Sequence, residues 1–419
     1  MSGATTMARK PGAMRHFWVF TGASAVSKLG NTFLNVAMPW ILLQVTGSAL
    51  VAAASFGVQL APYALSPVFG VLVDRFDRRR VFVWAEIAQG VLVALLPLLV
   101  YADSAVPVLT LLFLIGCGGL TSELTSDFGL IPELAPADNL TKAYSWYTTT
   151  ISVMRFIGPA LVGVVIGTLG PRAALWIDAA TFLGTAAVAL TLPVRSAPDQ
   201  GPSLFRQMLR NGFSSFWQLR KVRRLTAALA VFNLGAGAVP TVLIVLAQTH
   251  WGWGPQAAGA ALGIGALGAA AGAWITPRVA RGRGLETRIG IWFCVCGLGG
   301  ALMLFGSAPT VIAGFTLLSM GEGGMNVTTN EYRYTAIAKD LLGRVNAIIR
   351  AIIITGAAVS SLVLGATAET DSPYLWLAPV LVGGVLAGGI WSTRSLPAPV
   401  PEPLARTADH GECHDFPRA

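Results

Sequence analysis

The sequence predicts an all-α membrane protein made of two six-helix bundles that are related by pseudo-symmetry. Twelve apolar stretches reach the length that a helix needs to cross the hydrocarbon core of a bilayer, about 20 residues. The polar, basic segment 194–224 separates the first six stretches from the last six. The short polar breaks after the fourth and tenth stretches resemble each other, as expected for a six-helix unit that occurs twice.

The composition supports this fold class. Hydrophobic residues make up 54% of the chain and charged residues 12%, whereas soluble domains carry about 25% charged residues. The net charge of +9 is distributed over loops between apolar stretches, which argues against nucleic-acid binding. The four cysteines form no disulfide framework. Cys294 and Cys296 would point to different faces of a helix, so no metal site is expected.

The expected spans follow one another with short connections. In the first half they are 17–44, 49–73, 81–101, 106–127, 142–169 and 172–193. In the second half they are 225–249, 256–279, 287–307, 310–332, 344–368 and 372–393.

We expect four segments along the chain. Residues 1–193 would form the N-terminal six-helix bundle, 194–224 a cytoplasmic linker, and 225–396 the C-terminal six-helix bundle. The tail 397–419 begins with repeated prolines, which cannot hold a helix, and is expected to be disordered.

Lys and Arg residues are distributed unevenly over the two sides of the expected bundle. Of the 29 in the chain, Lys28, Arg155 and Arg350 fall within spans and Arg172 lies on one side. The others lie on the side that holds both termini. Because cytoplasmic loops are enriched in Lys and Arg, both termini are expected in the cytoplasm, and the chain in the inner (cytoplasmic) membrane.

The loop between the second and third spans carries the most specific motif. Residues 70–80, GVLVDRFDRRR, resemble the signature G-x-L-x-D-R-x-x-R-R, with Asp77 where the general signature has glycine. Weaker features of the same family pattern lie in matching order along the chain. They are Ser48, the connection 131–140, Gly158 with Pro159, and residues 343–345. Over nearly all of 17–393 the chain resembles transporters of the major facilitator superfamily, and most of all its bacterial efflux branch of macrolide and siderophore exporters.

The resemblance implies a conformational latch formed by Gly70, Asp74, Arg75, Arg78 and Arg79. In the pattern of the family, Asp74 caps the N-terminus of the eleventh helix and pairs with Arg78 when the protein is open outward. A carboxylate near a helix N-terminus is favourable, and a charge pair that breaks during rocking can bias two states. The alternative is that the arginines only set the topology.

The fifth span carries a second motif. Gly158, Pro159 and Gly163 resemble an antiporter motif of the same family, G-x-x-x-G-P-x-x-G-G, although Met154 and Val162 stand where glycines are expected. The resemblance implies export. The alternative is that these glycines only allow close packing against a neighbouring helix.

Ionisable residues at membrane depth are costly unless they are paired or hydrated, so each marks a candidate site. In the family, the first, second, fourth and fifth helices of each bundle line the central cavity. Arg350 then counts among the cavity charges, while Glu86 and Asp178, on supporting helices, are expected to be structural. The candidate substrate and proton-coupling residues are Lys28, Asn31, Glu123, Asp127, Arg155, Glu322, Asn326 and Asn330.

The tenth span carries a polar face at helical spacing. It is our first choice for the substrate site, and a hydrogen-bond network between helices is the alternative. The face consists of Glu322, Asn326, Thr329, Asn330 and Arg333.

Proton coupling is assigned to Glu322 or Glu123, because Asn31 stands where close relatives carry an acid. Lys28 or Arg155 would hold one of these carboxylates ionised until substrate binding removes the contact. Arg155 is also a candidate for attracting an anionic substrate.

We therefore expect a secondary active transporter, not an enzyme, that exports a hydrophobic or amphipathic drug or natural product by alternating access in exchange for protons. No nucleotide motif G-x-x-x-x-G-K-[ST] occurs, and no cofactor or metal is expected. The expected partners are the substrate, protons and the lipid bilayer, without nucleic acid, and the protein is expected to be a monomer. The alternatives are an importer or uniporter of a small metabolite, and a membrane sensor that does not transport.

Overall fold

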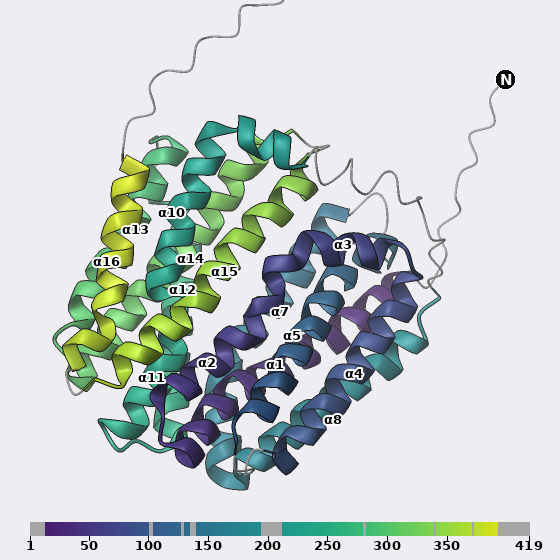
Figure 1. Cartoon of the computed structure of the whole chain (residues 1–419). Coiled ribbons are helices and arrows are strands. Elements are labelled where there is room, and N and C mark those ends of the chain that lie inside the picture. Colours follow the sequence, from purple (N-terminus) through teal and green to yellow (C-terminus); the bar gives the residue numbers. More distant parts are fainter. Residues whose placement is uncertain are drawn as a thin grey trace, which may run out of the picture.

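The computed structural model of the protein describes residues 13–99, 104–126, 130–134, 140–193, 212–279, 282–338, 341–370 and 373–392. These residues are almost entirely helical and include no strand (Figure 1). The tail 397–419 and residues 194–211 of the linker lie outside the described residues.

The first six spans occupy the expected stretches. A short helix, α6 (Ile131–Leu134), lies in the connection between the fourth and fifth spans. The spans are formed by α1 (Ala13–Thr46), α2 (Ala49–Leu60) with η1 (Ala61–Leu65) and α3 (Ser66–Asp74), α4 (Arg78–Leu99), α5 (Val106–Thr125), α7 (Leu140–Leu169) and α8 (Pro171–Leu190).

The last six spans also match the expected positions. They are formed by α10 (Arg220–Ala236) with α11 (Val239–Thr249), α12 (Pro255–Ile275), α13 (Leu285–Met303), α14 (Ala308–Ala336), α15 (Leu342–Ala368) and α16 (Pro373–Ser392). The prediction of twelve membrane helices is confirmed.

Two spans that were expected as single helices are interrupted. In the second span the 3₁₀ turn η1 contains Pro62, and α3 has Pro67 in its first turn. In the seventh span the helix ends at Ala236 and resumes before Pro240. Proline has no backbone N–H to donate and its ring crowds the preceding turn, which explains both breaks.

Among the described residues, ten helical stretches are long and apolar enough to cross a membrane by length and composition alone. The two remaining spans, α1 and α14, have 34 and 29 residues, so their length is sufficient. Their lower apolar character follows from the polar residues they carry, among them Lys28 and Asn31 on α1 and Glu322 and Asn326 on α14.

The helices pack into two bundles with matching internal contacts. In the first bundle α1 packs on α7 and α8, and α4 packs on α5 and α8. In the second bundle α10 packs on α15 and α16, and α13 packs on α14 and α16. These are the same pairs when the six spans of each bundle are compared in order, which confirms the predicted pseudo-symmetry. Figure 1 shows the purple-to-blue bundle beside the green-to-yellow one.

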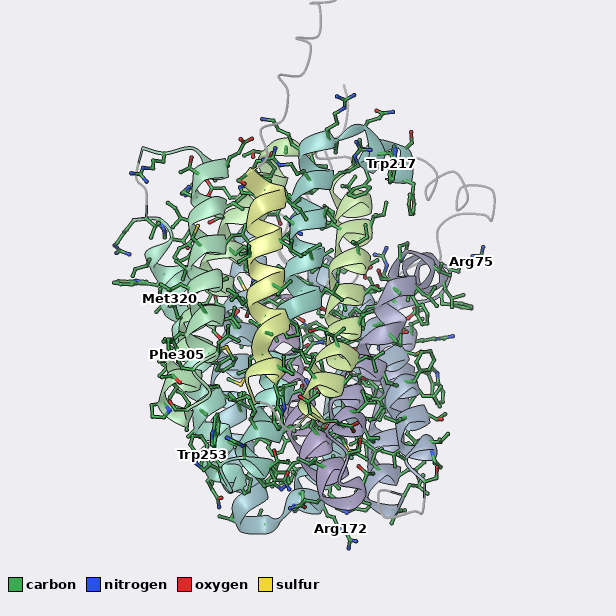
Figure 2. All side chains as sticks on the ribbon, turned by 60° about the vertical axis from the view of Figure 1, so that its left-hand side comes forward. Arg75, Arg172, Trp217, Trp253, Phe305 and Met320 are labelled. Carbon is green, nitrogen blue, oxygen red and sulfur yellow. The ribbon has the colours of Figure 1, made fainter. Side chains whose placement is uncertain are left out.

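Two helix pairs make most of the contact between the bundles. α2 packs on α15, and α7 packs on α12. We call the end of the molecule where α1 and α10 begin the basic end, and the end where α2, α8 and α16 begin the far end. In Figure 2 Arg75 and Trp217 lie towards the basic end, and Arg172 lies at the far end.

Candidate functional site

Glu123 and Arg350 form an ion pair that joins the two bundles. Nη2 of Arg350 on α15 lies 2.6 Å from Oε1 of Glu123 on α5. The second carboxylate oxygen of Glu123 accepts a hydrogen bond from the Tyr63 hydroxyl at 2.8 Å. The side chains of Arg350 and Glu123 are 23% and 17% exposed. Each charge therefore relies on the other for much of its compensation.

Tyr63 owes its place to the break in the second span. It lies in the 3₁₀ turn η1, directly after Pro62, and its ring faces the guanidinium of Arg350 at 5.4 Å from the ring centroid. Our sequence reasoning found Glu123 and Arg350 but missed Tyr63. The signal that was available is a tyrosine between two prolines in the middle of an apolar span.

The polar face of α14 is present but does not form a single cluster. Glu322 is half-buried, and within the described part of the chain its side chain makes no hydrogen bond or ion pair. Asn326 and Asn330 are exposed. Nε of Arg333 donates to the carbonyl of Thr329 at 3.2 Å, one turn earlier on the same helix. Within the described residues, the hydrogen bonds of Thr329 and Arg333 thus stay within α14.

In the first bundle, Lys28 lies half-buried on α1 and interacts electrostatically with Glu86 of α4. Glu86 is only 2% exposed and accepts hydrogen bonds from Ser122 Oγ on α5 at 2.5 Å and from Ser27 Oγ on α1 at 3.1 Å. One buried carboxylate therefore ties three helices together, which fits the structural role that we expect for it. Asn31, one turn along α1, is also half-buried.

Asp178 lies at the centre of the first bundle. It is fully buried on α8, and within the described residues neither of its carboxylate oxygens has a partner with hydrogen-bond geometry, because the nearby Thr181 hydroxyl donates to the backbone carbonyl of Asp178. A Cβ added at Gly30 of α1 would lie 2.4 Å from Oδ1 of Asp178, so the two helices approach closely here. Three other candidates are not settled: Asp127 and the side chains of Asp74 and Arg155 lie outside the described residues.

The charged residues between α3 and α4 make contacts within the first bundle. Oδ1 of Asp77 accepts a hydrogen bond from the backbone N of Arg80 at 2.8 Å, so Asp77 caps the N-terminus of α4. Arg78 pairs with Glu133 of α6 at 3.3 Å. Nε of Arg79 donates to the carbonyl of Ala189 at the end of α8 at 3.1 Å, a favourable place for a cation.

Gly70 and Arg75 are two further residues of the expected latch. Gly70 lies on α3 with open space around its Cα, and Arg75 is exposed. The pairing of Asp74 with Arg78 and with the start of α15 stays a prediction.

The far end is closed by a second polar contact between the bundles. Ser48 Oγ donates a hydrogen bond to Oε1 of Glu369 at 2.5 Å, and the backbone N of Leu50 donates to the same oxygen at 3.2 Å. Ser48 is the N-cap of α2, and Glu369 directly follows α15. The sequence pattern indicated Ser48 but gave no signal for Glu369.

The glycines of the fifth-span motif lie at close helix crossings. A Cβ added at Gly163 on α7 would lie 2.7 Å from the carbonyl oxygen of Pro255 and 3.0 Å from Cα of Gly259, both on α12. At Gly158 a Cβ would lie 3.0 Å from the side chain of Thr32 on α1. Gly163 thus forms part of the contact between the bundles, and Gly158 part of the contact within the first bundle.

Three known transport proteins are similar to this chain in sequence. The multidrug efflux pump Tap of Mycobacterium tuberculosis is 26% identical over 401 residues, which cover 89% of this chain and 93% of the pump. Macrolide efflux protein A of Streptococcus pyogenes is 26% identical over 223 residues, 52% of this chain and 54% of that protein. The staphyloferrin A transporter of Staphylococcus aureus is 23% identical over 270 residues, 62% and 66% of the two chains.

Solved structures share the fold. A bacterial homologue of the iron transporter ferroportin, in an inward-facing state, matches with a TM-score of 0.67 and 18% identity over 91% of this chain and 99% of that one. The nucleoside transporter NupG matches with a TM-score of 0.71 and 11% identity over 90% and 98%. The family model of the Major Facilitator Superfamily matches residues 20–361. The chain therefore belongs to the Major Facilitator Superfamily and is a multi-pass membrane transporter rather than an enzyme.

Proposed function

We propose that the protein is a secondary active exporter that expels a hydrophobic or amphipathic small molecule in exchange for protons. The observation that carries the proposal is the ion pair of Glu123 and Arg350, which connects the two bundles at membrane depth. This contact between the bundles depends on one ionised carboxylate. Protonation of that carboxylate therefore changes how freely the bundles rock against each other.

The same geometry leads us to assign proton coupling to Glu123. When Glu123 is ionised it holds Arg350 and accepts from Tyr63, so α5, η1 and α15 are tied together. A proton on Glu123 removes the negative charge, so Arg350 is released and the bundles separate at the basic end. Substrate that enters there promotes loss of the proton, which reforms the pair for the next half-cycle.

Glu322 is the weaker choice for the coupling carboxylate. Its side chain makes no ion pair or hydrogen bond within the described residues, so protonation there breaks no contact between the bundles. Glu322 and the exposed Asn326 remain our proposal for the substrate-binding face of α14.

The substrate class follows from similarity to efflux proteins. Tap is named as a multidrug efflux pump and its Streptococcus relative as a macrolide efflux protein. We further propose that the basic end faces the cytoplasm, because Lys and Arg gather in cytoplasmic loops, and that the protein acts as a monomer in the bacterial inner membrane.

Transport by everted membrane vesicles tests the proposal, with radiolabelled erythromycin and ethidium as probes. An imposed inside-acid pH gradient is expected to drive probe accumulation by the wild type. The Glu123→Gln variant is expected to lose the response to the pH gradient and to keep probe-for-probe exchange, because substrate binding does not require the charge. The Glu322→Gln variant tests the other carboxylate: it is expected to keep the pH response, with its effect confined to the affinity for the probe.

Three results would count against the proposal. Unchanged coupled flux in both variants would remove the proton assignment. Accumulation in right-side-out vesicles instead of everted ones would indicate an importer or uniporter. Saturable probe binding with no flux in proteoliposomes would indicate a sensor.

A further inference from the structure

A deep groove lies on the outer surface of the second bundle, between α13 and α16. Its volume is about 1210 Å³. The helices on either side expose large apolar residues to the surroundings: Leu298 is 62% exposed and Val385 61%. In a membrane-spanning protein such a surface faces lipid, and it lies away from the contacts between the two bundles.

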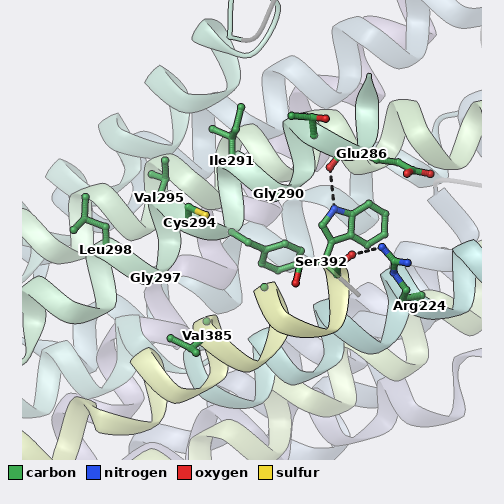
Figure 3. Close-up of a pocket in the computed structure, with 15 residues that line it drawn as sticks. Arg224, Glu286, Gly290, Ile291, Cys294, Val295, Gly297, Leu298, Val385 and Ser392 are labelled. Carbon is green, nitrogen blue, oxygen red and sulfur yellow. Dashed lines mark hydrogen bonds between the residues drawn. The ribbon is translucent and has the colours of Figure 1, made fainter. Parts of the chain in front are cut away.

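The two ends of the groove differ in polarity. Figure 3 shows Arg224 and Glu286 at one end and Leu298 at the other. Arg224 lies in the second turn of α10 and Glu286 in the first turn of α13, so the polar end is at the basic end of the molecule. From Glu286 to Leu298 the helix rises about 18 Å, at about 1.5 Å per residue. That length is close to one leaflet, since the hydrocarbon core is about 30 Å thick.

Within the described residues, the polar end of the groove carries one positive charge that has no carboxylate partner. Glu286 is already paired with Lys221, with 2.8 Å between Nζ and Oε1. Arg224 donates to the carbonyl of Trp391 and lies 4.9 Å from the centroid of its indole. Within the described residues Arg224 has no carboxylate partner, and its Nε is buried with no acceptor. Arg224 as a whole is only partly buried and lines the groove, so its other guanidinium N–H groups are open to an acceptor from outside the protein.

Glycines line the apolar part of the groove and leave space there because they have no side chain. Gly290 and Gly297 on α13 and Gly384 and Gly388 on α16 all line the pocket, and a Cβ added at Gly384 would lie 3.4 Å from Cα of Gly297. A Cβ added at Gly297 would meet no atom within 4 Å. The space is thus open, and at this depth hydrocarbon fills it because water has too few polar partners there.

We propose that this groove binds a phospholipid with an anionic headgroup, whose phosphate contacts Arg224 and one of whose acyl chains lies along Gly297 and Leu298. Guanidinium groups bind phosphate oxygens through paired, charge-assisted hydrogen bonds. Basic pockets between helices near the cytoplasmic side of a membrane favour anionic headgroups. The proposal is independent of the direction of transport and of the coupling ion.

Native mass spectrometry and thermal melting of the purified full-length protein in detergent test the proposal, with phosphatidylglycerol as the titrant. The wild type is expected to retain phosphatidylglycerol and to melt at a higher temperature in its presence. Arg224→Gln is expected to bind it about five-fold more weakly, the effect of one basic residue near a headgroup. Gly297→Leu, whose Cβ would meet no atom within 4 Å and whose longer side chain occupies the groove, is expected to abolish the stabilisation.

Matched controls separate the site from general effects. Arg223→Gln removes the same charge from the next residue of α10, which stacks on Trp217 and does not line the groove. Gly389→Leu adds the same side chain to α16 at an open position outside the lining. Both are expected to bind like the wild type.

Other ligands of the groove are expected to change the melting temperature differently from phosphatidylglycerol. Phosphatidylcholine is expected to stabilise less than phosphatidylglycerol, and glycerol 3-phosphate, which has no acyl chains, is expected to have no effect. Equal stabilisation by phosphatidylcholine, an effect of glycerol 3-phosphate alone, or wild-type phosphatidylglycerol binding by both Arg224→Gln and Gly297→Leu would overturn the proposal.

Discussion

Ser48 donates a hydrogen bond to Glu369 across the interface between the two bundles, with 2.5 Å between the oxygen atoms. Because the same carboxylate also accepts from the backbone of Leu50, Glu369 caps the first turn of a helix in the other bundle. The latch expected at Asp74 concerns the opposite end of the same helix pair, since Asp74 ends α3 and lies on the side where α15 begins.

Glu369→Gln is expected to weaken closure of the far end. A hydrogen bond to a charged group contributes about 1.5–3 kcal/mol, so the population open at the far end should rise by about ten-fold or more. Spin labels placed on α2 and α15 near this end would report the change as longer distances. Ser48→Ala, which removes the donor, is expected to have the same effect. Ser307→Ala is its control, because Ser307 also precedes a helix at the far end but, within the described residues, its hydroxyl contacts only Thr310 of the same helix. Unchanged distances in Glu369→Gln would contradict a gating role.

The contributions of Glu123 and Arg350 are expected to be strongly non-additive. Removal of either partner leaves a poorly compensated charge, whereas removal of both does not. In a cycle of Glu123→Gln, Arg350→Gln and the double variant, we expect a coupling energy of about 1–3 kcal/mol in the free energy of unfolding. Tyr63→Phe, which deletes only the hydroxyl that donates to the carboxylate of Glu123, should cost about 1.5–3 kcal/mol. Additive effects of the two substitutions would show that the pair is not formed in the membrane.

Gly163→Val is expected to stop transport. The added side chain would collide with the backbone of α12, so α7 and α12 could not approach at the far end. Overpacking of this kind costs about 1–3 kcal/mol. Transport in vesicles and cysteine accessibility at the far end would measure the result. Gly184→Val on α8 is the control, because no atom lies within 4 Å of a Cβ added there. Normal transport by Gly163→Val would refute the close crossing.

Ser122→Ala is expected to destabilise the first bundle without changing the direction of transport. Glu86 would lose one of its two hydroxyl donors while it remains buried, at a cost of about 1.5–3 kcal/mol. Thermal melting of the detergent-solubilised protein measures the loss. Thr168→Ala, at an exposed hydroxyl that bonds only its own helix, should change the melting temperature little. A melting temperature equal to that of the wild type would argue against the buried network.

A further test concerns the departure of Asp77 from the family signature. Asp77 caps α4, so Asp77→Ala is expected to cost about 1 kcal/mol of stability, and Asp77→Gly only a few tenths. Equal effects of the two substitutions on thermal melting would show that the side-chain cap is not formed.

Much of the fold follows from sequence alone, and the spans illustrate why. A helix in lipid must satisfy its backbone within itself and needs a minimum apolar length. Both requirements are local, so α5 and α12 appear within a few residues of the expected limits. The break at Pro62 was local too, but the apolar character of the second span concealed it.

The candidate site also has a part that the sequence predicts and a part that it does not. Residue type and depth were enough to select Glu123 and Arg350 as charges that require compensation. Which partners compensate them depends on how α5, η1 and α15 lie side by side, and no period in the sequence encodes that arrangement. The same holds for Glu369 with Ser48.

The sequence by itself determined the number, order and length of the membrane spans and the charges that needed partners, because these depend on short-range chemistry in each helix. Only the tertiary structure decided the pairing of Glu123 with Arg350, the partner of Arg78, and the groove that ends at Arg224. Those features arise from residues far apart in the chain, whose contacts are set by the packing of the two bundles.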